Sequence, residues 1–467
     1  MLFNTYSFLF GFLPVVLAGW WGLARWRPLR LAFLTGASWF FYAWWDWRYL
    51  PVLIGATSID YIAGLWLSRT DVEARRRLLL TASLATNIGI LAYFKYSGFF
   101  FSSFDGVGKA LGLGAPLPTL HVVLPIGISF YTFNSMSYTI DIFRRRIEPT
   151  RSVLEYTTFV GLFPHLIAGP IVRFTDLAGQ LKRLTPKLTS QQAALGAFFL
   201  SCGLVKKLVI ADQLHPYVSR LYADHTHLGL LTGWAAAVGY SLQLYFDFSG
   251  YSDMAVGLAW LLGFRFPQNF NSPFKAENIS DFWRRWHMSL SNWFRDYLFI
   301  PLGGSRLGAR RTVLNLILTM FLAGLWHGAA WTFVVWGLVH GFFLASHAVL
   351  RKAGLTPPWV TVNRLVTFAL VSGAFVIFRS PSLNVAGNVL GSMIGLNGLD
   401  NATQINALLP VKFGLLVAAL LVFVNVAPNT WQIRIRPRVW HGMAAGVAAA
   451  LAVMTISQPH PFIYFQF

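Results

Sequence analysis

Long apolar segments recur along the whole chain, and they limit its fold more than any other feature of the sequence. Each is about long enough to cross the roughly 30 Å of hydrocarbon in a bilayer as a helix. They cover residues 6–24, 30–45, 51–67, 78–101, 122–143, 156–172, 192–211, 229–263, 312–326, 329–350, 360–378, 408–427 and 440–457. Only 12% of the residues are charged, against about 25% in soluble domains. The pattern predicts an all-α polytopic membrane protein with roughly 10 to 13 spans, some of them re-entrant.

The basic residues give a net charge of +20, which would also suit a nucleic-acid-binding protein. They fall, however, in short clusters between the apolar segments, as the positive-inside rule requires. The clusters are Arg25/Arg27/Arg30, Arg69/Arg75/Arg76/Arg77, Arg144/Arg145/Arg146/Arg151, Arg310/Arg311, Arg351/Lys352 and Arg434/Arg436/Arg438. We therefore expect them to face the cytoplasm and the anionic headgroups of a phospholipid membrane, and we expect no nucleic-acid partner.

No loop or tail is long enough for a separate soluble domain, so we expect one integral-membrane domain over residues 1–467. The first apolar run has no basic residues before it and no evident cleavage site, which favours a retained first span. The single cysteine, Cys202, excludes an intramolecular disulfide and a cysteine metal site. The histidines show no metal-ligand spacing, and no nucleotide-binding or hydrolase motif is present. We expect neither a bound metal nor a tightly bound cofactor.

His327 is the strongest candidate for chemistry, in Leu325-Trp326-His327-Gly328-Ala329 within a predicted helical hairpin over residues 312–350. An ionisable side chain at membrane depth is costly and therefore suggests a function. Arg311 lies 16 residues before it and Arg351 lies 24 residues after it. This spacing puts His327 roughly 24 Å or more from the cytoplasmic face, in the middle or outer half of the membrane. A general base there could join a cytoplasmic donor to an extracytoplasmic acceptor. Position alone allows a packed histidine at a helix end equally well.

Residues 265–311 are polar, aromatic and basic, and they predict an amphipathic helix in the membrane interface. On an ideal helix, one arc of about 120° contains Trp283, Trp286, His287, Leu290, Trp293, Phe294 and Tyr297. His287 therefore points inward and is a second candidate catalytic residue, although a histidine on an apolar face is more often a hydrogen-bonded core residue. The candidate substrate-binding residues are Asn269, Trp283, Arg284, Arg285, Trp326, His165 and Arg173.

Several of these candidates have a structural alternative. Asn269 could simply shape a turn between prolines. His165 and Arg173 bracket a segment rich in Pro and Gly, which suggests a broken helix lining a cavity. Asp247 and Asp253 could line a funnel or pair with Arg284 or Arg285, and we favour structural pairing for both aspartates.

Together these motifs resemble the membrane-bound O-acyltransferase superfamily, and more closely its bacterial alginate O-acetyltransferase branch. The resemblance is carried by the N-terminal aromatic segment and by residues 125–133, 163–173, 245–253, 269–304, 324–329 and the closing 462–467. It implies a ring of transmembrane helices around a central funnel. It also implies that His327 is the catalytic residue and that His287 is a second functional position.

The resemblance further implies an O-acyltransferase in the cytoplasmic (inner) membrane of a bacterium. Such an enzyme would move an acetyl group from a cytoplasmic thioester, acetyl-CoA, to a polysaccharide hydroxyl or to a periplasmic acetyltransferase partner, in alginate-like O-acetylation. The alternatives are a transporter or conduit, and a non-catalytic scaffold of a polysaccharide-modification complex. Transporters often contain inverted repeats, and the sequence shows no such symmetry.

Overall fold

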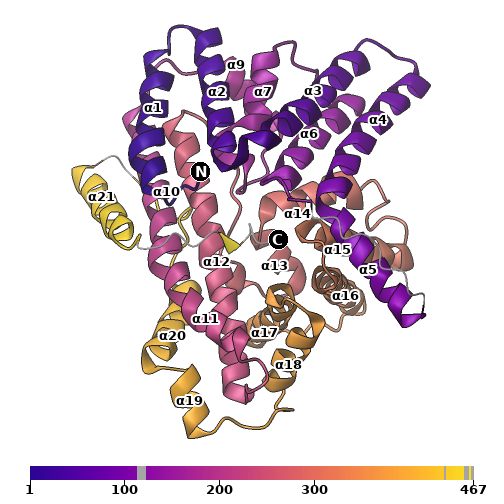
Figure 1. Cartoon of the computed structure of the whole chain (residues 1–467), viewed down its shortest axis with the longest axis vertical. Coiled ribbons are helices and arrows are strands. Elements are labelled where there is room, and N and C mark those ends of the chain that lie inside the picture. The colour runs from indigo at the N-terminus through magenta and orange to yellow at the C-terminus, as the bar shows by residue number, and fades with distance from the viewer. Residues whose placement is uncertain (113–121, 436–437, 457–461, 464–467) are drawn as a thin grey trace. The chain divides into compact units, whose positions relative to one another are not determined.

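The computed structural model describes residues 1–112, 122–435, 438–456 and 462–463, and within these ranges all regular secondary structure is helical (Figure 1). Arg436 and the last four residues of the closing motif lie outside the described residues. Within the described ranges, five helical stretches are long and apolar enough to cross a membrane: Arg27–Leu67, Glu73–Lys109, Ser190–Ala223, Trp331–Lys352 and Val360–Arg379. Shorter apolar helices cover Ser7–Gly22, Val411–Val426 and Trp440–Met454. The prediction of an all-α, multi-pass membrane protein is confirmed.

The chain forms two compact units, which we describe separately. Unit 1 contains residues 1–197 and 255–267, and unit 2 contains residues 198–254 and 268–467. Two helices, α10 (Ser190–Leu204) and α12 (Leu230–Leu261), begin in one unit and end in the other. That the whole chain acts as one integral-membrane domain stays a prediction.

Unit 1 is built largely from apolar helices that approach one another closely. In chain order they are η1 (Ser7–Phe12), α1 (Leu13–Gly22), α2 (Arg27–Asp46), η2 (Trp47–Tyr49), α3 (Leu50–Leu67), α4 (Glu73–Leu91), η3 (Ala92–Tyr96), α5 (Ser97–Ala110), α6 (Ile128–Phe143), α7 (Val153–Gly161), α8 (Phe163–Leu166) and α9 (Phe174–Lys182). Helices α3, α4 and α6 contact one another, as Figure 1 shows. A Cβ atom on Gly64 of α3 would lie only 2.8 Å from the Tyr138 ring of α6.

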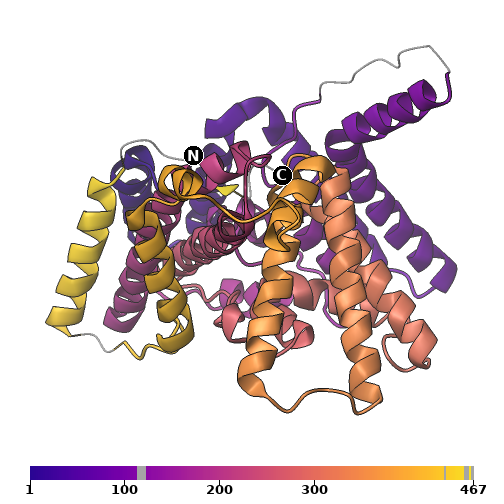
Figure 2. The same cartoon turned by 90° about the horizontal axis from the view of Figure 1, so that it is seen from below.

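Unit 2 carries most of the chain after α10. Its elements are η4 (Val205–Ala211), α11 (Asp212–Ala223), η5 (Pro273–Lys275), α13 (Ile279–Arg285), α14 (Met288–Phe294), η6 (Arg295–Phe299), α15 (Ala309–His327), α16 (Trp331–Lys352), α17 (Val360–Arg379), α18 (Leu383–Met393), α19 (Ala402–Leu408), α20 (Val411–Val426) and α21 (Val439–Met454). Figure 2 shows α16 and α17 as neighbouring helices joined by a loop.

The single amphipathic helix predicted through residues 283–297 is wrong. Helix α13 ends at Arg285, Trp286 is extended, and His287 has a left-handed backbone with φ 42° before α14 begins. The predicted inward residues Trp286, His287 and Leu290 are nevertheless buried. Most of the predicted burial pattern is therefore correct even though the helix is interrupted; the exceptions are Ser289, which is buried, and Trp283, which is only partly buried.

The expected pairing of the two buried aspartates is correct in kind, but the partners are lysines and not arginines. The Nζ atom of Lys206 lies 2.6 Å from Asp253, and that of Lys207 lies 2.7 Å from Asp247. Glycine makes this pairing possible, because a Cβ atom on Gly203 would lie 2.5 Å from the Gly250 carbonyl oxygen of α12. The close approach brings the lysines that follow Gly203 within reach of the aspartates on α12.

Candidate active site

Helices α15 and α16 pack with their backbones in contact, and this packing fixes the position of His327. A Cβ atom on Gly324 would lie 2.3 Å from the Phe333 carbonyl oxygen, and one on Gly337 would lie 2.5 Å from that of Met320. Small residues allow this approach between membrane helices. His327 is the last residue of α15, and Gly328 continues in extended conformation against the Phe333 ring.

Aromatic rings enclose His327, whose exposed fraction is only 6%. Ring centroids lie 5.1 Å away for Trp326, 5.0 Å for Trp336 and 5.3 Å for Phe378, each with its ring steeply inclined to the imidazole. Phe378 comes from α17, so three helices contribute to the enclosure. A site of this kind holds little water, and electrostatic interactions inside it are strong.

His287 lies in the same neighbourhood as His327. It is fully buried, its ring centroid is 4.7 Å from that of Phe248, and it is 6.2 Å from that of Trp326. Trp326 therefore contacts both histidines. The structure thus brings together two predicted catalytic residues and one predicted substrate-binding residue. His287 and His327 are 40 positions apart in the sequence.

Asn269 determines the tautomer of His287. The backbone N–H and the hydroxyl of Ser289 both donate to Asn269 Oδ1, at 3.3 and 2.9 Å, and this identifies Oδ1 as an acceptor. His287 Nδ1 lies 3.1 Å from the same oxygen and must therefore donate to it. Burial lowers the pKa of His287 to about 3, so the ring is neutral and Nε2 carries the lone pair.

Asn269 also explains the break between α13 and α14. Its backbone carbonyl accepts from Met288 N–H at 2.9 Å, and its side chain donates to Ser252 at 3.0 Å. Together with the bonds to His287 and Ser289, these contacts hold His287 in a backbone conformation that few non-glycine residues adopt. Asn269 is therefore more than a turn residue, because it orients the histidine.

His340 on α16 is a buried residue that the sequence reasoning missed. Its Nδ1 accepts a hydrogen bond from Trp283 Nε1 at 3.3 Å, and its ring lies 4.8 Å from that of Trp336. Trp336 in turn contacts His327, so Trp283, His340 and Trp336 form a continuous wall beside the catalytic candidate. A signal was available: His340 lies within an apolar span, where any ionisable residue suggests a function.

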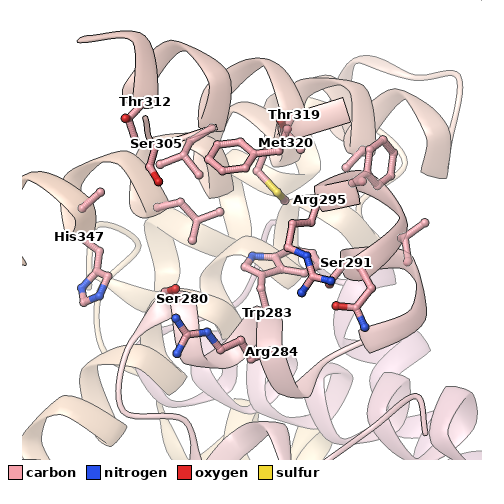
Figure 3. A pocket seen from close by; sticks show the side chains of 18 of the residues that line it. Ser280, Trp283, Arg284, Ser291, Arg295, Ser305, Thr312, Thr319, Met320 and His347 are labelled. Carbon is pink, nitrogen blue, oxygen red and sulfur yellow. The ribbon is translucent and has the colours of Figure 1, made fainter. Parts of the chain in front are cut away.

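A cavity of about 360 Å³ extends along α13, α14, α15 and α16 (Figure 3). Basic side chains border it, namely Arg284, Arg295, His347 and Arg351. Its apolar lining includes Trp283, Leu290, Met320, Leu344 and Ala323. Ala323 lies one helical turn before His327 on α15, and Trp283 contacts Trp336, which in turn contacts His327.

The other predicted binding residues are not among those that line this cavity. Arg285 pairs with Asp281 at 2.9 Å and is not among the lining residues. His165 and Arg173 belong to unit 1, where His165 Nδ1 lies 3.2 Å from the Asn134 amide. The backbone between them leaves helical conformation after Leu166, so the helix is broken there as predicted. That this segment lines a cavity stays a prediction. Their role in substrate binding stays a prediction.

Comparison with known proteins places these elements in a family context. The sequence profile of the membrane-bound O-acyltransferase family matches residues 2–379. A peptidoglycan O-acetyltransferase of Helicobacter pylori is 39% identical over 432 residues, which cover 86% of this chain and 81% of that protein. A probable alginate O-acetylase of Pseudomonas syringae pv. tomato is 44% identical over 432 residues, covering 90% and 80%.

A more distant relative is the teichoic acid D-alanyltransferase of Bacillus subtilis, 30% identical over 276 residues that cover 56% of this chain and 70% of that protein. The family match includes every helix that encloses His327, up to the end of α17 at Arg379. Among the residues described, no group of three or more His, Cys, Asp or Glu side chains could hold a metal ion.

Proposed function

The chain belongs to the membrane-bound O-acyltransferase family, and we propose that this enzyme moves an acetyl group from a cytoplasmic thioester to a hydroxyl of a polysaccharide. The donor we propose is acetyl-CoA. Relatives named for O-acetylation of peptidoglycan and alginate support acetyl as the transferred group. The observation that carries the proposal is His327, enclosed by aromatic rings one helical turn beyond a cavity with a basic border.

The cavity suits a donor that is anionic at one end and apolar at the other. Arginines bind phosphate oxygens through charge-assisted hydrogen bonds, and Arg284, Arg295 and Arg351 border the cavity. The apolar lining at Trp283, Met320 and Ala323 would accommodate the uncharged arm of the donor. In this arrangement the thioester points along α15 toward His327.

His327 would act as the general base. It takes the proton of the acceptor hydroxyl, whose oxygen attacks the thioester carbonyl carbon and forms the new ester bond. The carbon–sulfur bond breaks, and the departing thiolate receives the proton from His327. Proton transfer of this kind contributes about 10²–10⁴-fold to the rate. A transient acetyl-His327 is an alternative route to the same products.

His287 would orient the acceptor rather than stabilise an oxyanion. Its neutral tautomer, set by Asn269, carries a lone pair on Nε2, and a lone pair accepts a hydrogen bond from a hydroxyl. The acceptor hydroxyl could then be held with its oxygen directed at the thioester. Orientation of reactants is a major source of enzymatic rate acceleration.

We place the enzyme in the inner membrane of a bacterium, in agreement with its bacterial relatives. The acceptor is either the polysaccharide itself or a hydroxyl of a periplasmic acetyltransferase partner that passes the acetyl group on. Alginate-like exopolysaccharide and peptidoglycan are the two polymers that the relatives' names suggest.

The test uses the full-length protein in nanodiscs with acetyl-CoA labelled in the acetyl group. Alginate, peptidoglycan fragments and a periplasmic acetyltransferase are supplied in separate reactions, and label transfer is followed over time. We expect His327→Ala to abolish transfer. The matched control is His227→Ala, because His227 is an exposed histidine paired with Asp224. Transfer that persists in folded His327→Ala would overturn the assignment of His327. Absence of transfer by wild type with every acceptor would favour a conduit or a scaffold.

A further inference from the structure

Unit 1 contains a buried carboxylate in a segment apolar enough to cross a membrane. Asp60 on α3 is fully buried, within the helical stretch Arg27–Leu67. Among the residues described in the structure, no Lys, Arg or His side chain forms an ion pair with it. An ionised carboxylate in such surroundings is very unfavourable unless a positive charge compensates it.

Hydrogen-bond donors from two other helices surround this carboxylate. The Ser83 hydroxyl donates to it at 2.5 Å, and the Asn87 amide donates to its two oxygens at 2.9 and 2.8 Å, both from α4. The Thr139 hydroxyl of α6 lies at 3.5 Å. These donors suit an ionised carboxylate, and they leave its negative charge uncompensated.

Further buried oxygen atoms lie around the same point. Ser135, one helical turn before Thr139, is fully buried and lies beside both Asp60 and Tyr156. Ser135 Oγ, Tyr156 OH and Asn87 Oδ1 have no hydrogen-bond partner of good geometry within the described part of the chain. Buried polar atoms are nearly always satisfied, so these oxygens indicate a ligand that accepts their lone pairs.

We propose that this cluster binds one dehydrated sodium ion between α3, α4 and α6. Hard cations prefer oxygen ligands. The cluster offers the Asp60 carboxylate together with the hydroxyls of Ser83, Ser135 and Thr139. One carboxylate and several neutral oxygens balance a single positive charge, whereas a divalent ion would leave a buried excess charge.

The amide of Asn87 fits this assignment. An asparagine side chain presents a donor or an acceptor at the same place after a half turn of its terminal group. With Nδ2 toward Asp60 the amide solvates the bare carboxylate. With Oδ1 turned inward it would become a further ligand of the cation, and its unsatisfied oxygen would gain a partner.

Thermal unfolding of the full-length protein in detergent tests the proposal at constant ionic strength. NaCl would be compared with KCl and choline chloride. A ligand that binds only the folded state raises its stability with concentration, so we expect a saturable rise in Tm with sodium and a much smaller one with potassium. Binding of ²²Na⁺ by scintillation proximity should give one ion per chain.

Two variants keep the test decisive. Asp60→Asn removes the charge while keeping the shape, and we expect it to fold and to lose the sodium dependence. Ser135→Ala should still show the sodium-dependent rise in Tm, but the half-maximal rise should need about tenfold more sodium. A tenfold change corresponds to about 1.4 kcal/mol, which is what one good ligand contributes. Thr86→Ala is the matched control, since Thr86 is also on α4 but bonds to the Ala82 carbonyl. The same Tm in all three salts for wild type, or a sodium effect that survives in Asp60→Asn, would overturn the proposal.

Discussion

Unit 2 contains two buried polar regions whose titratable side chains have very different surroundings. The lysine–aspartate layer consists of Lys206, Lys207, Asp212, Asp247 and Asp253, and each lysine has a carboxylate oxygen within 2.8 Å. The histidine site consists of His327, His287 and His340 surrounded by aromatic rings. The layer holds charges that neutralise one another, whereas the site holds imidazoles in apolar surroundings.

This difference separates a structural role from a chemical one. Paired charges hold elements together, and the layer also anchors the chain near its end: Asp247 accepts from Ile463 N–H at 3.1 Å, and Lys207 lies over the Phe462 ring. An imidazole can take up and release a proton during a reaction. Substitutions in the two regions should therefore affect different measurements.

Substitution of His327 should give the largest effect of all, and this effect should fall on catalytic activity and not on stability. We expect His327→Gln to lower kcat/KM for acetyl transfer by about 10²–10⁴-fold, the usual contribution of a positioned general base. Glutamine keeps a polar group of similar size, so Tm should change little. Initial rates with labelled acetyl-CoA and a thermal melt of the same sample measure both. A large fall in Tm that accompanies the loss of activity would show instead that His327 is a packing residue.

The opposite result is expected for Lys206 in the lysine–aspartate layer. Lys206→Met leaves Asp253 buried without its counter-charge, and breaking such a pair costs about 3–5 kcal/mol. Remaining folded enzyme should retain its specific activity. The double variant Lys206→Met/Asp253→Leu removes both charges and should recover most of the stability. Chemical denaturation followed by tryptophan fluorescence measures this, and a double variant no more stable than the single one would contradict the assignment.

Sequence alone predicted the membrane class, because that class depends on a local pattern. It also singled out His327, which lies buried at the end of α15. Apolar length identifies spanning helices. The depth of His327, inferred from the charges of Arg311 and Arg351, stays a prediction. The break at His287 could not be predicted in this way. It depends on hydrogen bonds with Asn269, which is 18 residues away from His287 in the chain, and helical periodicity does not detect such a contact.

The partners of the buried aspartates were missed for a related reason. The sequence analysis offered Arg284 and Arg285 as partners, whereas the close contact of Gly203 with Gly250 brings lysines to Asp247 and Asp253. Such a contact becomes evident only in three dimensions. His340 could have been identified from the sequence. It is an ionisable residue within an apolar span, which is the same observation that identified His327.

The pH dependence of stability sharpens the comparison for His287. Burial lowers its folded pKa to about 3, below the ordinary value of 6.5, so the unfolded state binds more protons between these pH values. Stability from this group is complete above pH 6.5 and is lost as the pH falls toward 3. We expect a loss of about 2 kcal/mol between pH 7.5 and pH 5. Denaturation midpoints should show a weaker pH dependence in His287→Gln. Equal slopes in the two proteins would mean that His287 is not buried as a neutral ring.

The smallest expected effect compares two adjacent arginines on α13. Arg284 lines the cavity, whereas Arg285 is paired with Asp281. We expect Arg284→Gln to raise KM for acetyl-CoA by about two- to fivefold with kcat unchanged, because an exposed charge contributes only about 0.2–1 kcal/mol. Arg285→Gln should leave KM unchanged and lower stability slightly, since it loses only a partly exposed ion pair. Both variants remove one positive charge from the same helix, so any general electrostatic attraction of the donor is matched between them. Equal increases in KM would therefore mean that the donor responds to overall charge, and the cavity would lose its role as the donor site.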